Sequence, residues 1–275
     1  MNVVYCVHDE SDYSKHLLPA LAALYENNRV NDIRVTIIHL GISWVNEINA
    51  LASAYQRHVT YIHANDEEVA QLRSLPVIGF LNIGTNLRFL IFKYFQEPVL
   101  YLDVDTLVVT DLSILLSGQH GPVSAVLEPS VDLRCEKAKS LAVASYFNAG
   151  VIRVDAAVYD YDRVMSEVSH ILRKYGEKIT WGDQDILNIL FNNDKQLLDG
   201  AYNFIPFLSV GEPRIIHYAG RKPWSIRYRF WQPGAHYRTY MRYRAMTPLR
   251  DQSLSDFSLR RWLQYQFYAL FFGYK

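Results

Sequence analysis

Residues 98–105 read Pro-Val-Leu-Tyr-Leu-Asp-Val-Asp, an apolar run of strand length that ends in two carboxylates. One residue separates Asp103 from Asp105, so the period-two geometry of an extended chain directs both side chains to the same side. Two carboxylates that converge where a strand ends repel each other unless a cation lies between them. Hard divalent cations bind such oxygen pairs, but an isolated Asp-x-Asp is also typical of a solvated turn, and both interpretations stay open.

Upstream of this run, apolar stretches alternate with helical ones. The sequence predicts strands at 3–7, 33–40, 59–63 and 99–102, and helices at 17–25, 45–55 and 86–95. This βαβαβ order favours a mostly parallel sheet covered by helices on both faces, with a ligand site beyond the carboxyl ends of the strands. His8 to Asp12 and Asp103 to Asp105 are therefore expected at the same edge of the sheet.

Beyond residue 110 the alternation is looser. Strands are predicted at 123–127, 151–154 and 214–217, and helices at 158–175 and 185–191. No internal repeat, low-complexity linker or Pro/Gly-rich boundary occurs before about residue 221. We therefore expect one globular α/β domain over residues 1–223, followed by a separate region over residues 224–275.

Charge is distributed unevenly along the 275 residues. Residues 1–220 contain 17 Lys and Arg against 26 Asp and Glu, whereas residues 221–275 contain 11 against 2. The formal net charge of zero argues against a uniformly cationic nucleic-acid binder. The sequence therefore predicts an acidic body with a basic tail and no nucleic-acid partner.

The number of cysteines and the first residues of the sequence indicate the cellular compartment in which the protein is expected. Cys6 and Cys135 are too few for a disulfide framework, which favours a reducing environment. The first residues lack a basic stretch of the kind that begins a signal peptide, and no apolar window reaches the length of a spanning helix. We therefore expect a cytoplasmic protein.

Four segments, in order along the chain, resemble the signatures of the family 8 glycosyltransferases. They read YLDVD (101–105), YFNAGV (146–151), GDQDILN (182–188) and IHYAGRKPW (216–224). The family includes galactosyl- and glucosyltransferases of bacterial lipooligosaccharide and the glycogenins. The resemblance implies a GT-A fold, a single Rossmann-like mixed sheet flanked by helices. It also implies a UDP-galactose or UDP-glucose donor, Mn²⁺, and transfer to a glycan or glycolipid acceptor with retention at the anomeric carbon.

The same resemblance makes His217 a third metal ligand with Asp103 and Asp105. Read alone, a histidine that leaves a short apolar strand is more often structural. Two carboxylates and an imidazole suit Mn²⁺, with Mg²⁺ as the other option. Lys222 would meet the donor diphosphate, and Gly220 would let the backbone approach it. The family has one more residue between this glycine and lysine, so Arg221 is an alternative to Lys222.

The catalytic candidates implied by the resemblance are Asn148, Asp183 and Gln184. Asp183 would bind sugar hydroxyls, and Gln184 would lie close to the β-face of the anomeric carbon. Acids in the first turn of a helix are also ordinary capping residues. An amide is a poor nucleophile, so we expect departure and attack on one face rather than a covalent intermediate.

Further donor contacts are implied in other segments. Arg88 matches an arginine that reaches the sugar, with a helix-surface charge as the alternative. A uridine motif of the family is replaced by the longer segment from His8 to Tyr13. The full set of expected substrate-binding residues is Cys6, Val7, His8, Tyr13, Arg88, Asp103, Val104, Asp105, Asn148, Ala149, Gly150, Asp183, Gln184, Gly220 and Lys222.

From Trp224 to Tyr274 the tail carries 15 aromatic residues interleaved with arginines. Such a segment can bind an anionic bilayer surface, and Ser253 with Asp256 resembles a capping box for a helix over 254–272. This would attach the protein peripherally to the inner face of the plasma membrane, close to a membrane-bound acceptor. The alternative is a C-terminal helix packed on the acidic body.

Two competing functions remain at this stage. A nucleotidyltransferase would also place a metal at a strand end, but it needs a glycine-rich loop after the first strand, and residues 8–13 contain no glycine. The other is a degenerate, non-catalytic sugar-nucleotide-binding protein. Against it, the polar residues of all four signatures are present.

Overall fold

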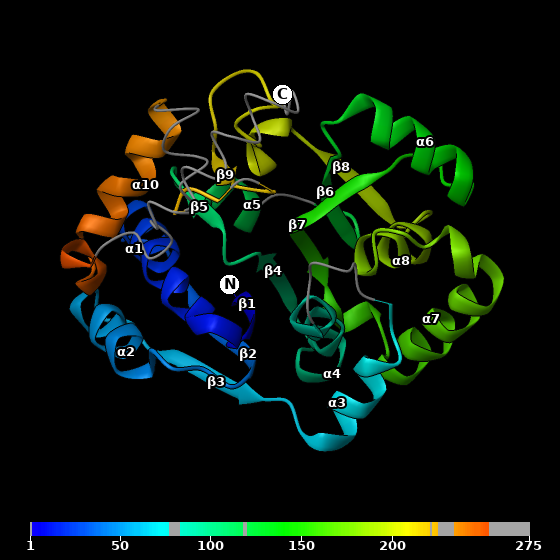
Figure 1. Ribbon diagram of the computed structural model, residues 1–275, viewed down its shortest axis with the longest axis horizontal. Coiled ribbons are helices and arrows are strands. Elements are labelled where there is room, and N and C mark those ends of the chain that lie inside the picture. Colours follow the sequence, from blue (N-terminus) through cyan, green and yellow to red (C-terminus); the bar gives the residue numbers. More distant parts are fainter. Residues whose placement is uncertain (1, 77–82, 118–119, 221, 225–233, 253–275) are drawn as a thin grey trace, which may run out of the picture.

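The computed structural model describes residues 2–76, 83–117, 120–220, 222–224 and 234–252. Within them, seven strands form one mixed sheet in the order β3-β2-β1-β4-β7-β6-β8 (Figure 1). The strands β1 to β4 run parallel, β7 runs antiparallel to β4 and β6, and β8 is parallel to β6. Their bounds are Asn2–His8 (β1), Arg34–Leu40 (β2), Val59–His63 (β3), Pro98–Leu102 (β4), Val123–Leu127 (β6), Phe147–Asp155 (β7) and Lys195–Leu198 (β8).

Helices cover both faces of this sheet (Figure 1). One face packs against α1 (Leu17–Asn27) and α2 (Val45–Ala54). The other packs against the 3₁₀ segment η2 (Ile83–Leu90), α4 (Ile91–Tyr94), α7 (Tyr161–Tyr175) and α8 (Asp183–Leu190). The remaining helices are α3 (Asp66–Arg73), α5 (Ser113–Ser117), α6 (Val131–Leu141), α10 (Ala235–Ala245) and the 3₁₀ segments η1 (Glu10–His16), η3 (Ala156–Val158), η4 (Gly176–Lys178), η5 (Gly200–Asn203) and η6 (Pro248–Asp251).

Strand β1 shows why the sheet has two cores. Val3, Tyr5 and Val7 contribute to the core beneath α1, whereas Val4 and Cys6 contribute to the core beneath η2 and α8. Successive side chains of a strand point to opposite faces, so a strand that is apolar at every position is buried on both faces. The expected α/β fold is confirmed.

A second, two-stranded sheet begins where β4 ends. It pairs β5 (Thr106–Val108) antiparallel with β9 (Ile215–His217), with Thr106 opposite His217. The backbone N–H of Tyr218 also donates to the carbonyl oxygen of Asp105, at 2.9 Å. Residues more than one hundred positions apart in the sequence are thereby held side by side at the carboxyl edge of the main sheet.

The predicted elements are largely confirmed, with two kinds of difference. Residues 86–95 are not one α-helix, because η2 is a 3₁₀ segment and only α4 is α-helical. The strand predicted at 214–217 exists as β9, but it lies in the small sheet instead of extending the main one. Elements α3, α5, α6, α10, β5 and β8 were not predicted. Strands β5 and β8 are only three and four residues long, and α6 and β8 are largely exposed or partly buried, so they lack the apolar pattern of longer buried elements.

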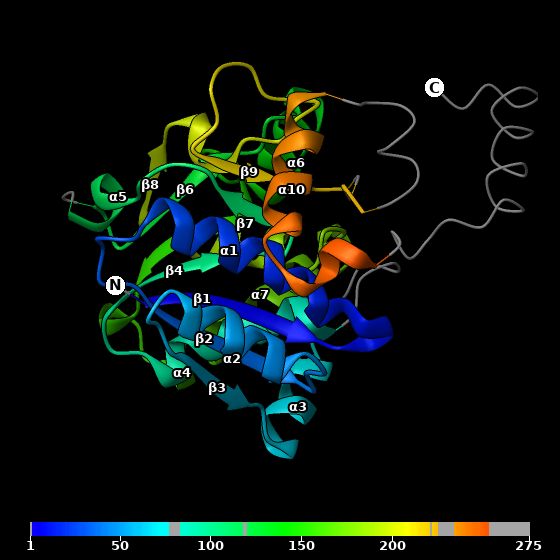
Figure 2. The same cartoon turned by 90° about the vertical axis from the view of Figure 1, so that its left-hand side faces the viewer.

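The tail packs on the body where the structure describes it. Helix α10 packs across α1 (Figures 1 and 2), and Tyr240 and Tyr243 are buried in the same core as α1. The Asn27 side-chain amide donates to the Tyr243 hydroxyl at 2.7 Å. The helix expected over 254–272, with Ser253 and Asp256, lies outside the described residues, and the division after residue 223 stays a prediction. Among the described residues, none of the helices is long and apolar enough to cross a bilayer.

Candidate active site

A cavity of about 480 Å³ opens at the carboxyl ends of β1 and β4. Its other walls come from η1, η2, the beginning of β7, the start of α8, and the end of β9 with the segment after it. Its lining contains every residue that the sequence predicts for donor or metal binding, apart from Val7 and from the alternative ligand Arg221, which lies outside the described residues. The lining residues are Cys6, His8, Tyr13, Gly84, Thr85, Arg88, Tyr101, Asp103, Val104, Asp105, Asn148, Ala149, Gly150, Trp181, Asp183, Gln184, His217, Ala219, Gly220 and Lys222.

Val7 does not line the cavity. Its side chain is buried in the core beneath α1, because it points to the opposite face of β1 from the cavity residue Cys6. The side chain of Val7 is therefore turned away from the cavity, and its place among the substrate-binding residues stays a prediction.

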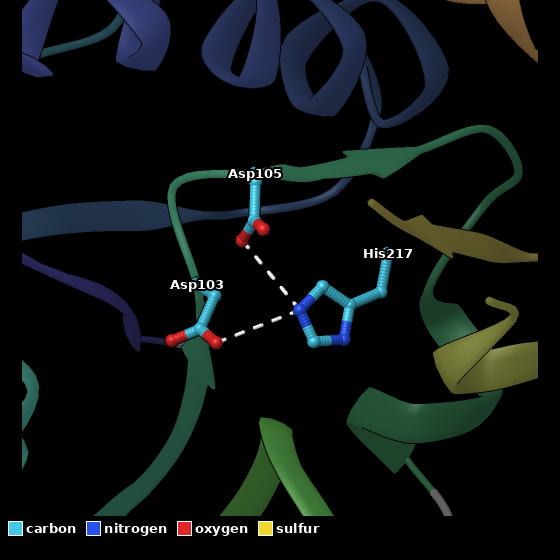
Figure 3. A group of neighbouring side chains, drawn as sticks. All are labelled: Asp103, Asp105 and His217. Carbon is cyan, nitrogen blue, oxygen red and sulfur yellow. Dashed lines mark ion pairs between the residues drawn. The ribbon is translucent and has the colours of Figure 1, made fainter. Parts of the chain in front are cut away.

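The two carboxylates of the Asp-x-Asp motif converge with an imidazole (Figure 3). His217 Nε2 lies 3.6 Å from Asp103 Oδ2 and 3.5 Å from Asp105 Oδ1. One ligand atom from each of the three residues lies within 4.8 Å of the others. Ligands at about 2.1 Å in an octahedral site are about 3 Å apart, so these atoms could share one divalent cation after small movements.

Position 150 of β7 supports the imidazole of His217. A Cβ added to Gly150 would overlap the ring, at 2.6 Å from Nδ1 and 2.7 Å from Nε2. The ring therefore occupies the space where any other residue would carry its side chain. The resemblance implies that Gly150 lines the donor sugar, and the structure adds this steric reason for a glycine.

Lys222 lies at the metal-site carboxylates. Its ammonium group forms an ion pair with Asp105 and also approaches the carbonyl oxygen of Tyr218, at 3.3 Å. Burial alone would raise the pKa of the Asp105 carboxyl, but the positive charge of the facing Lys222 is the largest opposing effect, and that pKa lies well below its ordinary value. Arg221, the alternative diphosphate ligand, lies outside the described residues.

Arg88 connects the metal-site carboxylates to the start of α8. Its Nη2 lies 3.1 Å from Asp103 Oδ1, its Nε lies 3.1 Å from Asp183 Oδ2, and its Nη1 donates to the carbonyl oxygen of Ala149 at 2.6 Å. The guanidinium also stacks over the Tyr101 ring at 4.4 Å. Arg88 is buried, so the interpretation of a solvated helix-surface charge is wrong.

Asp183 is a buried carboxyl with an unusual protonation equilibrium. Burial raises its pKa to about 6, with Arg88 opposing the rise and the Asp103 carboxylate adding to it. An acid that only caps a helix is ordinarily exposed, whereas Asp183 is 4% exposed and faces the cavity. This environment fits a group that receives hydrogen bonds from a ligand.

Neighbouring groups determine the orientation of the Gln184 amide. Its Oε1 accepts from the backbone N–H of Ala149 at 3.0 Å, and its Nε2 donates to the Tyr146 hydroxyl at 3.2 Å. The Tyr146 hydroxyl itself donates to Asp185 Oδ1 at 2.6 Å. Asp185 is fully buried and also accepts from Lys137 Nζ at 2.8 Å. The backbone N–H of Ala149 can only donate, and the Tyr146 hydroxyl gives its hydrogen to Asp185, so together they determine the orientation of the Gln184 amide.

An aromatic cluster joins the N-terminal loop to the last signature. The rings of His16 and Trp224 stack with centroids 3.6 Å apart, and Tyr13 meets both rings edge-on. Burial lowers the pKa of His16 to about 3, so its ring is neutral in the stack. The cluster joins the segment that carries Lys222 to the segment from His8 to Tyr13, which stands in place of the family's uridine motif.

Several lining residues were missed from the sequence. Tyr101 lies inside the strand run, Gly84 and Thr85 precede the Arg88 segment, and Ala219 follows His217. Trp181 immediately precedes the third signature and is 38% exposed, although large aromatic side chains are usually more buried. For Trp181, the only signal in the sequence was its position directly before Gly182 and Asp183 of the third signature.

The chain is similar to known glycosyltransferases over most of its length. The profile described as glycosyl transferase family 8 matches residues 2–227. The chain is 25% identical over 241 residues to a putative glycosyltransferase of Haemophilus influenzae, an alignment that covers 80% of this chain and 71% of that protein. A lipopolysaccharide 1,3-galactosyltransferase of Salmonella typhimurium is 28% identical, with 64% of this chain and 58% of that protein covered. A lipopolysaccharide 1,2-glucosyltransferase of Escherichia coli is 26% identical, with 71% of this chain and 60% of that protein covered.

A crystal structure of the galactosyltransferase LgtC in complex with donor and acceptor sugar analogues superimposes with a TM-score of 0.76. The match covers 90% of this chain and 96% of that chain at 22% identity. At this identity the similarity establishes the fold, and the GT-A architecture implied by the sequence is confirmed.

Proposed function

Because the chain belongs to glycosyl transferase family 8, we propose that it is a retaining hexosyltransferase that moves galactose or glucose from a UDP-sugar to a glycan acceptor. One observation carries the proposal. Arg88 links Asp103 of the carboxylate pair to Asp183, which is next to Gln184. The place for a cation and diphosphate therefore adjoins the place for a sugar, as cleavage of a sugar–diphosphate bond requires.

The donor set at the carboxylate pair fits a divalent cation. Two carboxylates and an imidazole suit Mn²⁺, and Mg²⁺ accepts the carboxylates more readily than the imidazole. Bound there, the cation would supply Lewis-acid stabilisation of the departing diphosphate. Lys222, paired with Asp105, adds a positive charge for the same diphosphate oxygens.

The chain's own residues prepare the sugar for bond cleavage. The C1–oxygen bond breaks, its electron pair leaves with the β-phosphate, and the sugar becomes oxocarbenium-like. The Asp183 carboxylate would accept hydrogen bonds from sugar hydroxyls, with Arg88 keeping it in place. Tight positioning by buried groups of this kind lowers the entropic cost of reaching the transition state.

Gln184 supports a reaction on one face of the sugar. Its amide oxygen already accepts from the backbone N–H of Ala149, which reduces its capacity to attack C1. Amides are also weak nucleophiles compared with the carboxylates of retaining glycosidases. The acceptor hydroxyl would therefore attack from the face that UDP leaves, and the departing phosphate would take the hydroxyl proton.

The acceptor in our proposal is lipopolysaccharide, lipooligosaccharide or another cell-surface glycan under assembly. Support comes from the relatives named as lipopolysaccharide glucosyl- and galactosyltransferases. Because such acceptors are glycolipids, we also propose that the basic aromatic tail places the enzyme on the cytoplasmic face of the membrane, where it would bind anionic lipid.

Turnover of a panel of UDP-sugars tests the function. UDP release should be fastest with UDP-galactose or UDP-glucose, should need Mn²⁺ or Mg²⁺, and should increase with a lipopolysaccharide acceptor extract. A UDP-induced rise in melting temperature that needs Mn²⁺, without turnover of any donor, would instead indicate a binding protein. Pyrophosphate release from nucleoside triphosphates would indicate a nucleotidyltransferase.

A further inference from the structure

A chain of hydrogen bonds runs behind the metal-site histidine. It leads from Glu128 through Asn148 and Asn203 to the Nδ1 atom of His217. All four residues are at least nine-tenths buried, so solvent does not compete for these bonds. Asn203 is brought to His217 because residue 204 pairs with β9 on both sides, through Phe204 N to Ile215 O at 2.9 Å and His217 N to Phe204 O at 2.8 Å.

A backbone N–H group determines the orientation of the first amide, that of Asn148, in this chain of hydrogen bonds. The N–H of Gly150 can only donate, and it lies 3.0 Å from the side chain of Asn148, so the atom facing it is Oδ1. The Asn148 Nδ2 group then faces Glu128 Oε2 at 2.9 Å, where a carboxylate oxygen accepts. The Gly150 N–H and the Glu128 carboxylate therefore both favour the same orientation of the Asn148 amide, with Oδ1 toward Gly150 and Nδ2 toward Glu128.

That orientation determines the next amide. The side chain of Asn203 faces Asn148 Oδ1 at 3.0 Å and the Asn148 carbonyl oxygen at 3.4 Å. Since both of these atoms only accept, the group of Asn203 that faces them is Nδ2. Its Oδ1 atom is left to face His217 Nδ1, at 2.8 Å.

The last hydrogen bond, between Asn203 and His217, determines which nitrogen of the imidazole carries the hydrogen. An amide oxygen only accepts, so Nδ1 of His217 carries the hydrogen, and Nε2 of the neutral imidazole has a free lone pair. This lone pair is on the side of Asp103 and Asp105, the two carboxylates of the metal site. We propose that Asn203, oriented through Asn148 and Glu128, is a positioning residue that fixes His217 in the tautomer able to bind a metal through Nε2.

Without Asn203 the other tautomer becomes favourable. An Nε2–H group would donate to Asp103 or Asp105, and it would then block the nitrogen that a cation needs. Partners of this kind behind a metal ligand typically account for about 10- to 100-fold in metal affinity. This inference rests on the metal site of the proposed function and assigns a role to a residue outside the four sequence signatures.

Binding of Mn²⁺ alone, and with UDP, measured by electron paramagnetic resonance, tests the assignment. Asn203→Leu should bind Mn²⁺ about 10- to 100-fold more weakly than the parent protein. Asn203→Asp keeps an oxygen acceptor at Nδ1, so its affinity should stay close to that of the parent even though its melting temperature falls. Asn28→Leu removes another buried asparagine, which bonds Leu24 and Leu112 away from the cavity, and should lower stability without changing Mn²⁺ affinity.

The tautomer itself has a spectroscopic signature that does not depend on metal or activity. With ¹⁵N-labelled histidine, and His217→Gln for assignment, the metal-free protein at alkaline pH should show hydrogen on Nδ1 of His217. Hydrogen on Nε2 would overturn the inference. An equal loss of Mn²⁺ affinity in Asn203→Asp and Asn203→Leu would also overturn it, and so would unchanged affinity in both variants. A parent protein that shows the Nδ1–H tautomer but does not bind Mn²⁺ would overturn the proposed metal site and leave the positioning role of Asn203 standing.

Discussion

The imidazole of His217 lies directly against Gly150, in the space where any other residue would carry a Cβ. That hypothetical atom would come within 2.7 Å of both ring nitrogens. Gly150 also donates its N–H to Asn148, so the same residue makes room for the ring and orients the amides behind it. The position of the proposed metal ligand therefore depends on strand β7 as much as on its own strand, β9.

Gly150→Ala should displace the ring and decrease cation-dependent transfer at least about 100-fold, because errors of about 1 Å in a site have effects of this size. Circular dichroism should show a folded protein. The matched control is Gly200→Ala, where an added Cβ would have no atom of the described part of the chain within 4 Å. Full activity in Gly150→Ala would show that the ring position is unimportant.

Asp105→Asn should decrease turnover by about 10² to 10³, the loss typical of removing one electrostatic stabiliser. UDP release in Mn²⁺ measures the effect. Asp132→Asn, at an exposed acid in the first turn of α6, is the control and should be silent. Undiminished turnover of Asp105→Asn in Mn²⁺ would contradict the assignment of the site.

Tyr146→Phe should decrease kcat about 10-fold with little change in KM for the donor, because it removes the hydrogen bond that holds Gln184 Nε2, worth about 1 kcal/mol, together with the bond to Asp185. Steady-state kinetics with the preferred UDP-sugar give both constants. The control is Tyr5→Phe, because the buried Tyr5 hydroxyl has no hydrogen-bond partner among the described residues. An unchanged kcat in Tyr146→Phe would argue that the amide orientation has no role.

The buried carboxyl of Asp183 should make activity depend on pH. Since burial raises its pKa to about 6, the carboxylate that pairs with Arg88 is lost as the pH falls through that value, and kcat/KM should fall with it. Rate profiles between pH 5 and pH 8, compared with Asp183→Asn, would reveal the effect. A flat profile in the parent enzyme would contradict a role for ionised Asp183.

The raised pKa of the Asp183 carboxyl should also make the free energy of unfolding fall as the pH rises. Between its unfolded pKa of about 4 and its folded pKa, the native state binds a proton that the unfolded chain has released. Asp183 therefore lowers the free energy of unfolding as the pH rises through this window, by about 3 kcal/mol. Urea unfolding of the parent and Asp183→Asn at both ends of the window measures the difference, which should grow in favour of the variant as pH rises.

Removal of residues 253–275 should abolish binding to anionic vesicles while leaving the body folded. The truncation should end at Gln252, because Tyr240 and Tyr243 of α10 belong to the core beneath α1. Flotation with anionic and with neutral liposomes compares the full chain with the shortened one. Equal flotation of the two proteins would locate membrane binding elsewhere or exclude it.

Local sequence determined the greater part of the fold. The apolar runs at 3–7, 33–40 and 99–102 became β1, β2 and β4, because a strand buried on both faces must be apolar at successive positions. The placement of Asp103 and Asp105 at a strand end followed from the same pattern. The four signatures added the family, and with it the expected ligand set.

Tertiary structure decided which distant groups meet. Pairing of β5 with β9 brings His217 to the carboxylates, and the segment after β9 returns Lys222 to Asp105. Asn203 has no local signal at all, because its role depends on contacts with β7 and β9 that no periodicity encodes. Burial patterns in a sequence report which face of an element is covered, whereas hydrogen bonds between remote polar groups form only after the elements have packed.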